Sequence, residues 1–279
     1  MQVRLISVPY DSGRRAFRMG RGPGALMDWG LGDRISAAGH PVSLAELQGE
    51  EGDPTTSGFG LCGAVARQVR SAIQAGQFPL VLTGNCLLQL GVVAGIGATS
   101  TGVVWFDAHG DLNTPDTSVS GFLDGMALAA VTGHCLQEYA RDVEGFTPVS
   151  TDRVALVGVR DLDPPELVMI ERQAMLHVAS ATGEWRERVT RRLSPCDNVS
   201  VHLDLDALDP SVCSVNALQA ADGLSEEDVG GLLSMLAIDG HVVALTVSAY
   251  DPAGDSEQRT PPVVERLITT LLEAVSGER

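Results

Sequence analysis

The sequence is poor in basic and aromatic residues. Its 279 residues include 19 Lys and Arg against 36 Asp and Glu, which gives a formal net charge of −17, and only 4% are aromatic. Nucleic acids and anionic membrane surfaces both attract basic patches, so neither is expected as a partner. The sequence also contains no run of about 18 apolar residues, which argues against a transmembrane helix.

Paired cysteines and a nucleotide-binding motif are missing as well. The five cysteines are odd in number, widely separated and without a CxxC pair, which is typical of reduced thiols in a cytoplasm. The glycines of residues 91–98 lack the G-x-G-x-x-G order of dinucleotide sites. The apolar stretch at the amino end is too short for a signal peptide and indicates a first strand. We therefore expect a cytoplasmic protein.

Short apolar runs that alternate with helical segments define the expected fold. The runs are rich in β-branched residues, and they cover residues 3–10, 78–84, 101–109, 153–161, 199–206 and 242–250. Helices are predicted over 61–76, over 225–240 with an N-cap at Ser225, and over 263–279. This alternation predicts an α/β fold with a mostly parallel sheet covered on both faces. No repeat, linker or charge block divides the chain, so residues 1–279 are expected to form one domain.

Four of the predicted strands end in polar residues. These strand ends are Gly84-Asn85-Cys86, Asp107-Ala108-His109, Asp161-Leu162-Asp163 and Asp204-Leu205-Asp206. Ligand crevices of open α/β sheets lie at the carboxyl ends of the strands. We therefore expect these side chains to converge although they are far apart in sequence.

The segment DAHGDLN indicates a metal site. If extended geometry continues after the strand, Asp107, His109 and Asp111 point the same way at a period of two. Two carboxylates and an imidazole suit Mn²⁺ better than Zn²⁺ or Fe²⁺. The alternative is a polar loop whose Asp and His side chains cap the next helix.

A second pair of carboxylates follows the strand in HLDLDALDP. Asp204 and Asp206 would repel one another unless a cation lies between them. Asp209, before Pro210, fits a turn instead. Together the two segments offer four carboxylates and a histidine, enough for a site with two bridged metal ions.

These segments resemble the arginase/agmatinase (ureohydrolase) family. The family's marks GGDHS, DAHxDxN and SxDxDxxDP correspond, in order, to TGNCL, DAHGDLN and HLDLDALDP, and GRGPGAL resembles its amino-terminal glycine-proline segment. The resemblance covers nearly the whole chain. It implies a three-layer α/β/α arginase-like domain, two Mn²⁺ ions per subunit, and hydrolysis of a guanidino group by a bridging hydroxide. It assigns one ion to Cys86, Asp107, Asp111 and Asp204, and the other to Asp107, His109, Asp204 and Asp206.

The same resemblance implies an amino-acid substrate. Asn113, Ser118 and Ser120 match positions that hold the α-carboxylate in arginases proper, and Asp163 and Glu166 match positions that engage the α-amino group. Neutral donors suit a carboxylate and carboxylates suit an ammonium group. The alternative is that Asn113 and the serines are ordinary turn residues.

Two departures from the family pattern concern the ligands and the proton relay. Cys86 replaces a histidine ligand, and its thiolate is too soft to match Mn²⁺ well, so we expect a weaker ion on that side. Cys86 could instead be a buried apolar residue or a nucleophile, although no oxyanion pattern accompanies it. The neighbouring Asn85 replaces an aspartate. Asp124 replaces a histidine that, in the family, relays protons to the leaving amine. Asp124 is one candidate catalytic residue, and Asp111 of the DAHGDLN segment is the other.

The third departure concerns the substrate's guanidino group. Ala249 stands where the family has a glutamate that binds the guanidinium. A buried guanidinium needs a carboxylate partner, whereas the less basic N-hydroxyguanidine does not. The pattern is most similar to the family's amidinohydrolases of D-cycloserine biosynthesis, which implies conversion of Nω-hydroxy-L-arginine to L-ornithine and hydroxyurea. Arginine or agmatine as substrate, or a non-catalytic arginase-fold protein, are the alternatives. The survival of every carboxylate ligand favours an enzyme.

The remaining histidines and the carboxyl end carry weaker expectations. His134, His177, His202 and His241 lack ligand-like spacing and are expected at the surface or in the core with satisfied hydrogen bonds. Only about one helix follows Pro262, without the longer tail of trimeric arginases. A monomer or a small homo-oligomer is therefore expected.

Overall fold

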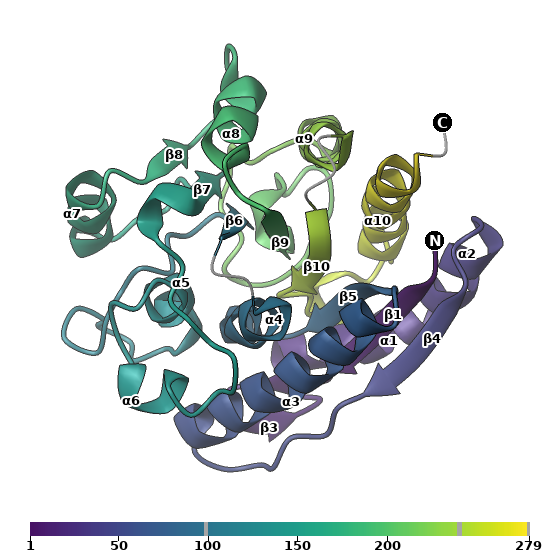
Figure 1. Cartoon of the computed structure of the whole chain (residues 1–279), viewed down its shortest axis with the longest axis horizontal. Helices are drawn as coiled ribbons and strands as arrows, with labels where there is room; N and C mark the ends of the chain where they lie inside the picture. Colours follow the sequence, from purple (N-terminus) through teal and green to yellow (C-terminus); the bar gives the residue numbers. More distant parts are fainter. Residues whose placement is uncertain (98–99, 239–241, 278–279) are drawn as a thin grey trace.

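A single eight-stranded sheet forms the centre of the computed structural model, which describes residues 1–97, 100–238 and 242–277 (Figure 1). Every neighbouring pair of strands in this sheet is parallel. In spatial order the strands are β4 (Val42–Glu46), β1 (Val3–Val8), β5 (Phe78–Thr83), β10 (Val242–Ser248), β9 (Asn198–Asp204), β6 (Thr101–Phe106), β7 (Val154–Val157) and β8 (Leu176–Val178). The six predicted strands are confirmed, and the short edge strands β4 and β8 are additional.

Helices cover both faces of the sheet, which confirms the three-layer α/β/α fold (Figure 1). One face carries α3 (Pro54–Gln74), α4 (Gln89–Ile96), α5 (Ala127–Val131), α6 (Gln137–Ala140) and α7 (Pro164–Arg172). The other carries α1 (Gly22–Asp28), α2 (Leu31–Ala37), α8 (Trp185–Leu193), α9 (Glu226–Ile238) and α10 (Thr260–Ser276). No helix in the described ranges is both long and apolar enough to cross a membrane.

Alternation along the strands produces two separate cores. On β1, Leu5 packs on the α1 side and Ile6 on the α3 side, and on β6 Phe106 and Trp105 divide in the same way. Successive side chains of a strand point to opposite faces, so a strand between two helical layers must be apolar on both. This explains the continuous apolar runs in the sequence.

Capping residues fix where two predicted helices begin. The Asp228 amide donates to Ser225 Oγ at 3.1 Å at the start of α9, which confirms Ser225 as its N-cap. Helix α3 begins at Pro54, earlier than the predicted residue 61, because Asp53 Oδ1 accepts from the Thr56 amide at 2.9 Å and a proline suits the first turn.

Short elements complete the loops around the sheet. A two-stranded antiparallel ribbon pairs β2 (Tyr10–Asp11) with β3 (Arg14–Arg15). Single 3₁₀ turns are η1 (Arg18–Arg21), η2 (Cys86–Leu88), η3 (Asp124–Met126), η4 (Thr151–Arg153), η5 (Leu205–Ala207) and η6 (Pro252–Gly254). Three of these turns, η2, η3 and η5, carry candidate site residues.

Candidate metal centre

Five adjacent strands supply the candidate site from their carboxyl ends. In spatial order, Cys86 follows β5, Ala249 follows β10, Asp204 ends β9, Asp107 follows β6, and Asp163 comes after β7. Cys86, Ala249, Asp204 and Asp107 line one small cavity, whereas Asp163 lines the wider cavity beside it. The expected convergence therefore follows from the parallel strand order.

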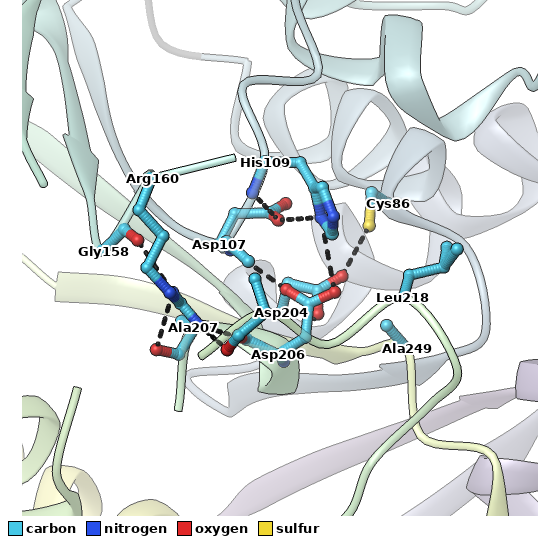
Figure 2. Close-up of polar contacts among 12 residues, drawn as sticks. Cys86, Asp107, His109, Gly158, Arg160, Asp204, Asp206, Ala207, Leu218 and Ala249 are labelled. Atoms are coloured by element: carbon cyan, nitrogen blue, oxygen red, sulfur yellow. Dashed lines mark hydrogen bonds and ion pairs between the residues drawn. The ribbon is translucent and has the colours of Figure 1, made fainter. Parts of the chain in front are cut away.

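Two overlapping groups of ligand atoms lie at this edge (Figure 2). An inner group joins Cys86, Asp107, His202 and Asp204, and an outer group joins Asp107, His109 and Asp206; in each, the ligand atoms lie within 4.8 Å of one another. Cys86 Sγ lies 3.0 Å from Asp204 Oδ2, and His109 Nδ1 lies 3.2 Å from Asp107 Oδ1. Asp107 belongs to both groups, as a bridging carboxylate would.

Asp111 departs from the extended geometry expected for it. Its φ is +51°, so the backbone turns into the left-handed region and the period-two pattern ends after His109. Asp111 belongs to neither close group. It still lines the same small cavity, and its buried Oδ2 has no hydrogen-bond partner. A buried carboxylate oxygen without a partner is costly, so Asp111 remains available to a cation.

His202 lies in the core, as one of the expected alternatives has it, and its Nε2 contacts Ser248 Oγ at 3.4 Å, but its hydrogen bonding is only partly satisfied and it belongs to the inner ligand group. The ring is fully buried and stacked on Trp105 at 3.9 Å, and its Nδ1 has no hydrogen-bond partner. The missed signal is its position two residues before Asp204 on β9, which places both side chains on one face of the sheet. His134 contacts Thr132 and His177 contacts Val159, as expected, and His241 lies outside the described residues.

The carboxylates of the cluster are electrostatically unfavourable without a cation. Burial raises the pKa of Asp107 to about 6, and Asp206 adds to the shift. Burial also raises the pKa values of Asp111 and Asp204, with repulsion from neighbouring carboxylates as the next cause. Although burial opposes it, the hydrogen bonds to Asp107 and Asp206 raise the pKa of His109 to about 12. A divalent cation would remove this repulsion and stabilise the charged forms.

Burial also keeps the thiol of Cys86 protonated. It raises the thiol's pKa well above its usual value, and the nearby Asp204 raises it further. A buried thiol among carboxylates is a poor nucleophile, because the reactive form is the thiolate. A metal ligand must also be the thiolate, so a cation in the inner group would have to displace the thiol's proton. Cys86 is a ligand candidate because its sulfur lies among the other ligand atoms.

Asp124 lies beside the cluster and is held by Asn85. The Asn85 amide group donates to Asp124 Oδ2 and, at 3.3 Å, to Asp11 Oδ1. The Leu87 amide donates to the other Asp124 oxygen at 3.4 Å. Burial, with repulsion from Asp11 as the next cause, raises the pKa of Asp124 to about 8. Asn85 therefore fixes a carboxyl group that can hold and release a proton near neutral pH.

Two connected cavities lead to these residues. The small inner one, of about 30 Å³, is lined by every member of the two ligand groups except His202, together with Asp124, Leu218 and Ala249. The outer one, of about 370 Å³, shares His109, Asp111, Phe122 and Leu218 with it. The outer cavity is therefore adjacent to the two ligand groups.

The five predicted substrate-binding residues all line the outer cavity: Asn113, Ser118, Ser120, Asp163 and Glu166. Asn113 Nδ2 donates to Asp163 Oδ2 at 2.9 Å, which joins the two proposed subsites. The oxygens of the buried Glu166 accept from the Leu112 and Asp163 amides at 2.9 and 2.8 Å. Glu166 therefore braces Asp163 in a helix-capping box at the start of α7.

Arg160 and Asn216 support the site, and sequence reasoning missed both. The Arg160 guanidinium donates to five backbone carbonyls, those of Gly158, Asp206, Ala207, Ala220 and Ala221 (Figure 2 shows the first three). Asn216 Nδ2 donates to Ala249 O at 3.0 Å and to Asp206 Oδ2 at 3.4 Å. No motif marks such contacts, since they depend on where distant backbone segments meet.

Comparison with known proteins places this geometry in a family. The family model described as "Arginase family" matches residues 1–273. The chain belongs to the arginase family. It is 29% identical to an arginase of Bacillus subtilis over 97% of each chain, and 34% identical to one of Brevibacillus brevis over 77% of this chain and 74% of that one.

Solved structures of the arginase family agree. A Bacillus cereus arginase superposes with a TM-score of 0.88 at 30% identity, covering 97% of this chain and 98% of the other. An agmatine ureohydrolase of Thermoplasma volcanium gives 0.73 at 19% identity, covering 99% and 89%, which shows the shared fold alone. This chain is therefore an arginase-family ureohydrolase with a cluster of possible metal ligands.

Proposed function

We propose that this arginase-family protein hydrolyses Nω-hydroxy-L-arginine to L-ornithine and hydroxyurea with two Mn²⁺ ions. The outer ligand group, two carboxylates and an imidazole, suits Mn²⁺. The inner group would hold its ion through Asp107, Asp204 and Cys86, with Asp111 nearby, and its sulfur makes that ion the weaker one. When bound, the ions would lower the pKa of a water molecule and supply a nucleophile for the guanidino carbon.

The remaining residues orient the substrate and move a proton. Asn113 and the two serines would hold the α-carboxylate in the outer cavity, and Asp163 would hold the ammonium group. The fixed Asp124 carboxyl lines the inner cavity and carries a proton near neutral pH. It would protonate the departing δ-nitrogen as the carbon–nitrogen bond breaks.

The observation that carries the choice of substrate is Ala249. Its side chain lines the inner cavity beside Leu218, so this wall offers methyl groups instead of a carboxylate. Asp124 also lines this cavity, and in the metal-free chain burial raises its pKa to about 8. A neutral N-hydroxyguanidine needs no ionic partner, whereas the guanidinium of arginine would lose its hydration without replacement.

The test compares three substrates on one protein sample. Mn²⁺-loaded protein is incubated with L-arginine, agmatine and Nω-hydroxy-L-arginine, and ornithine and putrescine are measured. We expect ornithine mainly from the hydroxylated substrate, and none from an Asp107→Asn variant, which lacks the shared carboxylate. No product from any substrate would refute the enzymatic function, and equal rates with arginine would refute the specificity.

Arginine itself is the second candidate. The curated relatives named above are both called arginase, which favours this substrate. A faster reaction with arginine than with its hydroxylated form would establish it, and would show that Ala249 does not control the choice.

A further inference from the structure

Leu218 and Phe122 are the two large apolar side chains that line both cavities. Leu218 is 49% exposed, and the wall that the two cavities share, where it lies, is called the neck below. Figure 2 shows it beside Ala249 at the edge of the carboxylate cluster. An apolar side chain at the neck of a polar cavity remains in water unless a ligand covers it.

The backbone around Leu218 is held on both sides. The Leu218 amide donates to Asn216 Oδ1 at 2.8 Å, and Asn216 in turn contacts Asp206 and Ala249. Beyond Leu218, Arg160 donates to the carbonyls of Ala220 and Ala221 at 2.7 and 2.8 Å. Because Arg160 also binds the Asp206 carbonyl at 3.0 Å, the segment 216–221 is tied to a metal ligand at both ends.

This position matches the aliphatic part of an extended amino acid. A substrate with its charged end at Asn113 and Asp163 and its reacting end at the ligand groups must pass its methylene groups through the neck. A leucine fixed there can cover those methylenes on binding, and its preset position reduces the entropy lost when they meet. The same side chain extends the apolar wall that begins at Ala249.

We propose that Leu218 is a specificity-determining residue that contacts the substrate's methylene chain and, with Ala249, excludes a charged guanidinium. This inference rests on the proposed function, because it assigns the selectivity of that reaction to one side chain. Leu218 has no hydrogen-bond acceptor for a guanidinium, and the cations held by the carboxylates would repel one. A neutral hydroxyguanidine meets neither penalty.

The test replaces Leu218 by residues of similar size and different polarity. In Leu218→Asn, the new amide oxygen can accept from a guanidinium, so we expect the ratio of kcat/KM for hydroxyarginine over arginine to fall about tenfold or more. In Leu218→Met, which stays apolar, the ratio should remain within about twofold. Leu44→Asn, at a similarly exposed leucine on the edge strand β4, controls for the general effect of the substitution.

Each outcome decides the proposal. An unchanged ratio in Leu218→Asn, or an equal change in Leu218→Met, would overturn it. If the wild-type chain hydrolyses neither compound, the proposed function fails, and calorimetric dissociation constants of both compounds for the Mn²⁺-loaded chain then replace the rates. A tenfold fall in the ratio of affinities for hydroxyarginine over arginine, seen in Leu218→Asn alone, would still support the role of Leu218. An equal fall in all variants, or no fall in any of them, would overturn it.

Discussion

The metal-free chain should lose stability as the pH rises from about 5 to about 7.5. The cause lies in buried carboxyl groups: the pKa values of Asp124 and Asp107 are raised from 3.8 to about 8 and about 6, and those of Asp111 and Asp204 are raised as well. A raised pKa means that the folded state binds the proton more tightly than the unfolded state does. Stability therefore falls with rising pH from the unfolded pKa up to the folded one.

The magnitude follows from these shifts. Each proton held only by the folded state changes the free energy of unfolding by about 1.4 kcal/mol per pH unit. Asp124 acts across the whole interval and contributes about 3 kcal/mol, and Asp107 acts up to about pH 6 and contributes about 1 kcal/mol. The raised pKa of His109 adds in the same direction above about pH 6.5. The pKa of His202, lowered by burial to about 3, acts in the opposite direction up to about pH 6.5 and offsets about 2 kcal/mol. The lowered pKa of Asp206 acts only below its usual 3.8.

Urea unfolding followed by circular dichroism measures this effect. Chelator-treated protein should unfold with less free energy at the higher pH, and added Mn²⁺ should stabilise the chain more at the higher pH than at the lower. Asp124→Asn should remove about 3 kcal/mol of the pH dependence, whereas Asp142→Asn at an exposed position should leave it unchanged. Equal stability of the metal-free protein at both pH values, or full pH dependence in Asp124→Asn, would refute the reasoning.

Three further predictions concern the ligands and the substrate wall. Cys86→His should raise the manganese content per chain measured by atomic emission, because imidazole suits Mn²⁺ better than a thiolate; unchanged content would argue that Cys86 does not face the metal. Trp105→Phe removes the indole N–H that lies 3.1 Å from Asp107 Oδ2 and should weaken Mn²⁺ binding about tenfold in a paramagnetic titration, and unaltered affinity would contradict this support role. Ala249→Glu should raise kcat/KM for arginine relative to hydroxyarginine about tenfold, and a constant ratio would count against the substrate proposal.

Sequence patterns predicted the strands, and the grouping of Asp107 and His109 after one of them, for a local reason. Buried parallel strands must be apolar on both faces, so β5, β6 and β9 stand out as continuous runs with polar residues where each ends. Asp107 and His109 follow β6 directly, so the strand direction fixes where they point. The edge strand β4 escaped prediction because its residues are half-buried or exposed and its apolar signal is weak.

Local sequence patterns did not predict the positions of residues where the backbone turns or where segments distant in sequence meet. The left-handed Asp111 ended the expected alternation, and His202 joined the inner group because it stacks on Trp105 of a neighbouring strand. The contacts of Arg160 with residues 206, 207, 220 and 221 connect segments that share no sequence signal.

By itself, the sequence determined the fold class, the carboxyl-end location of the candidate site and most of the residue types that gather there. These properties depend on strand periodicity and on motifs a few residues long. Only the tertiary structure decided which ligands lie within reach of one another, that Asn85 holds Asp124, and that Leu218 stands at the neck between two cavities. The physical reason is that these relations depend on the order of strands in the sheet and on loops that meet across it, which no local spacing encodes.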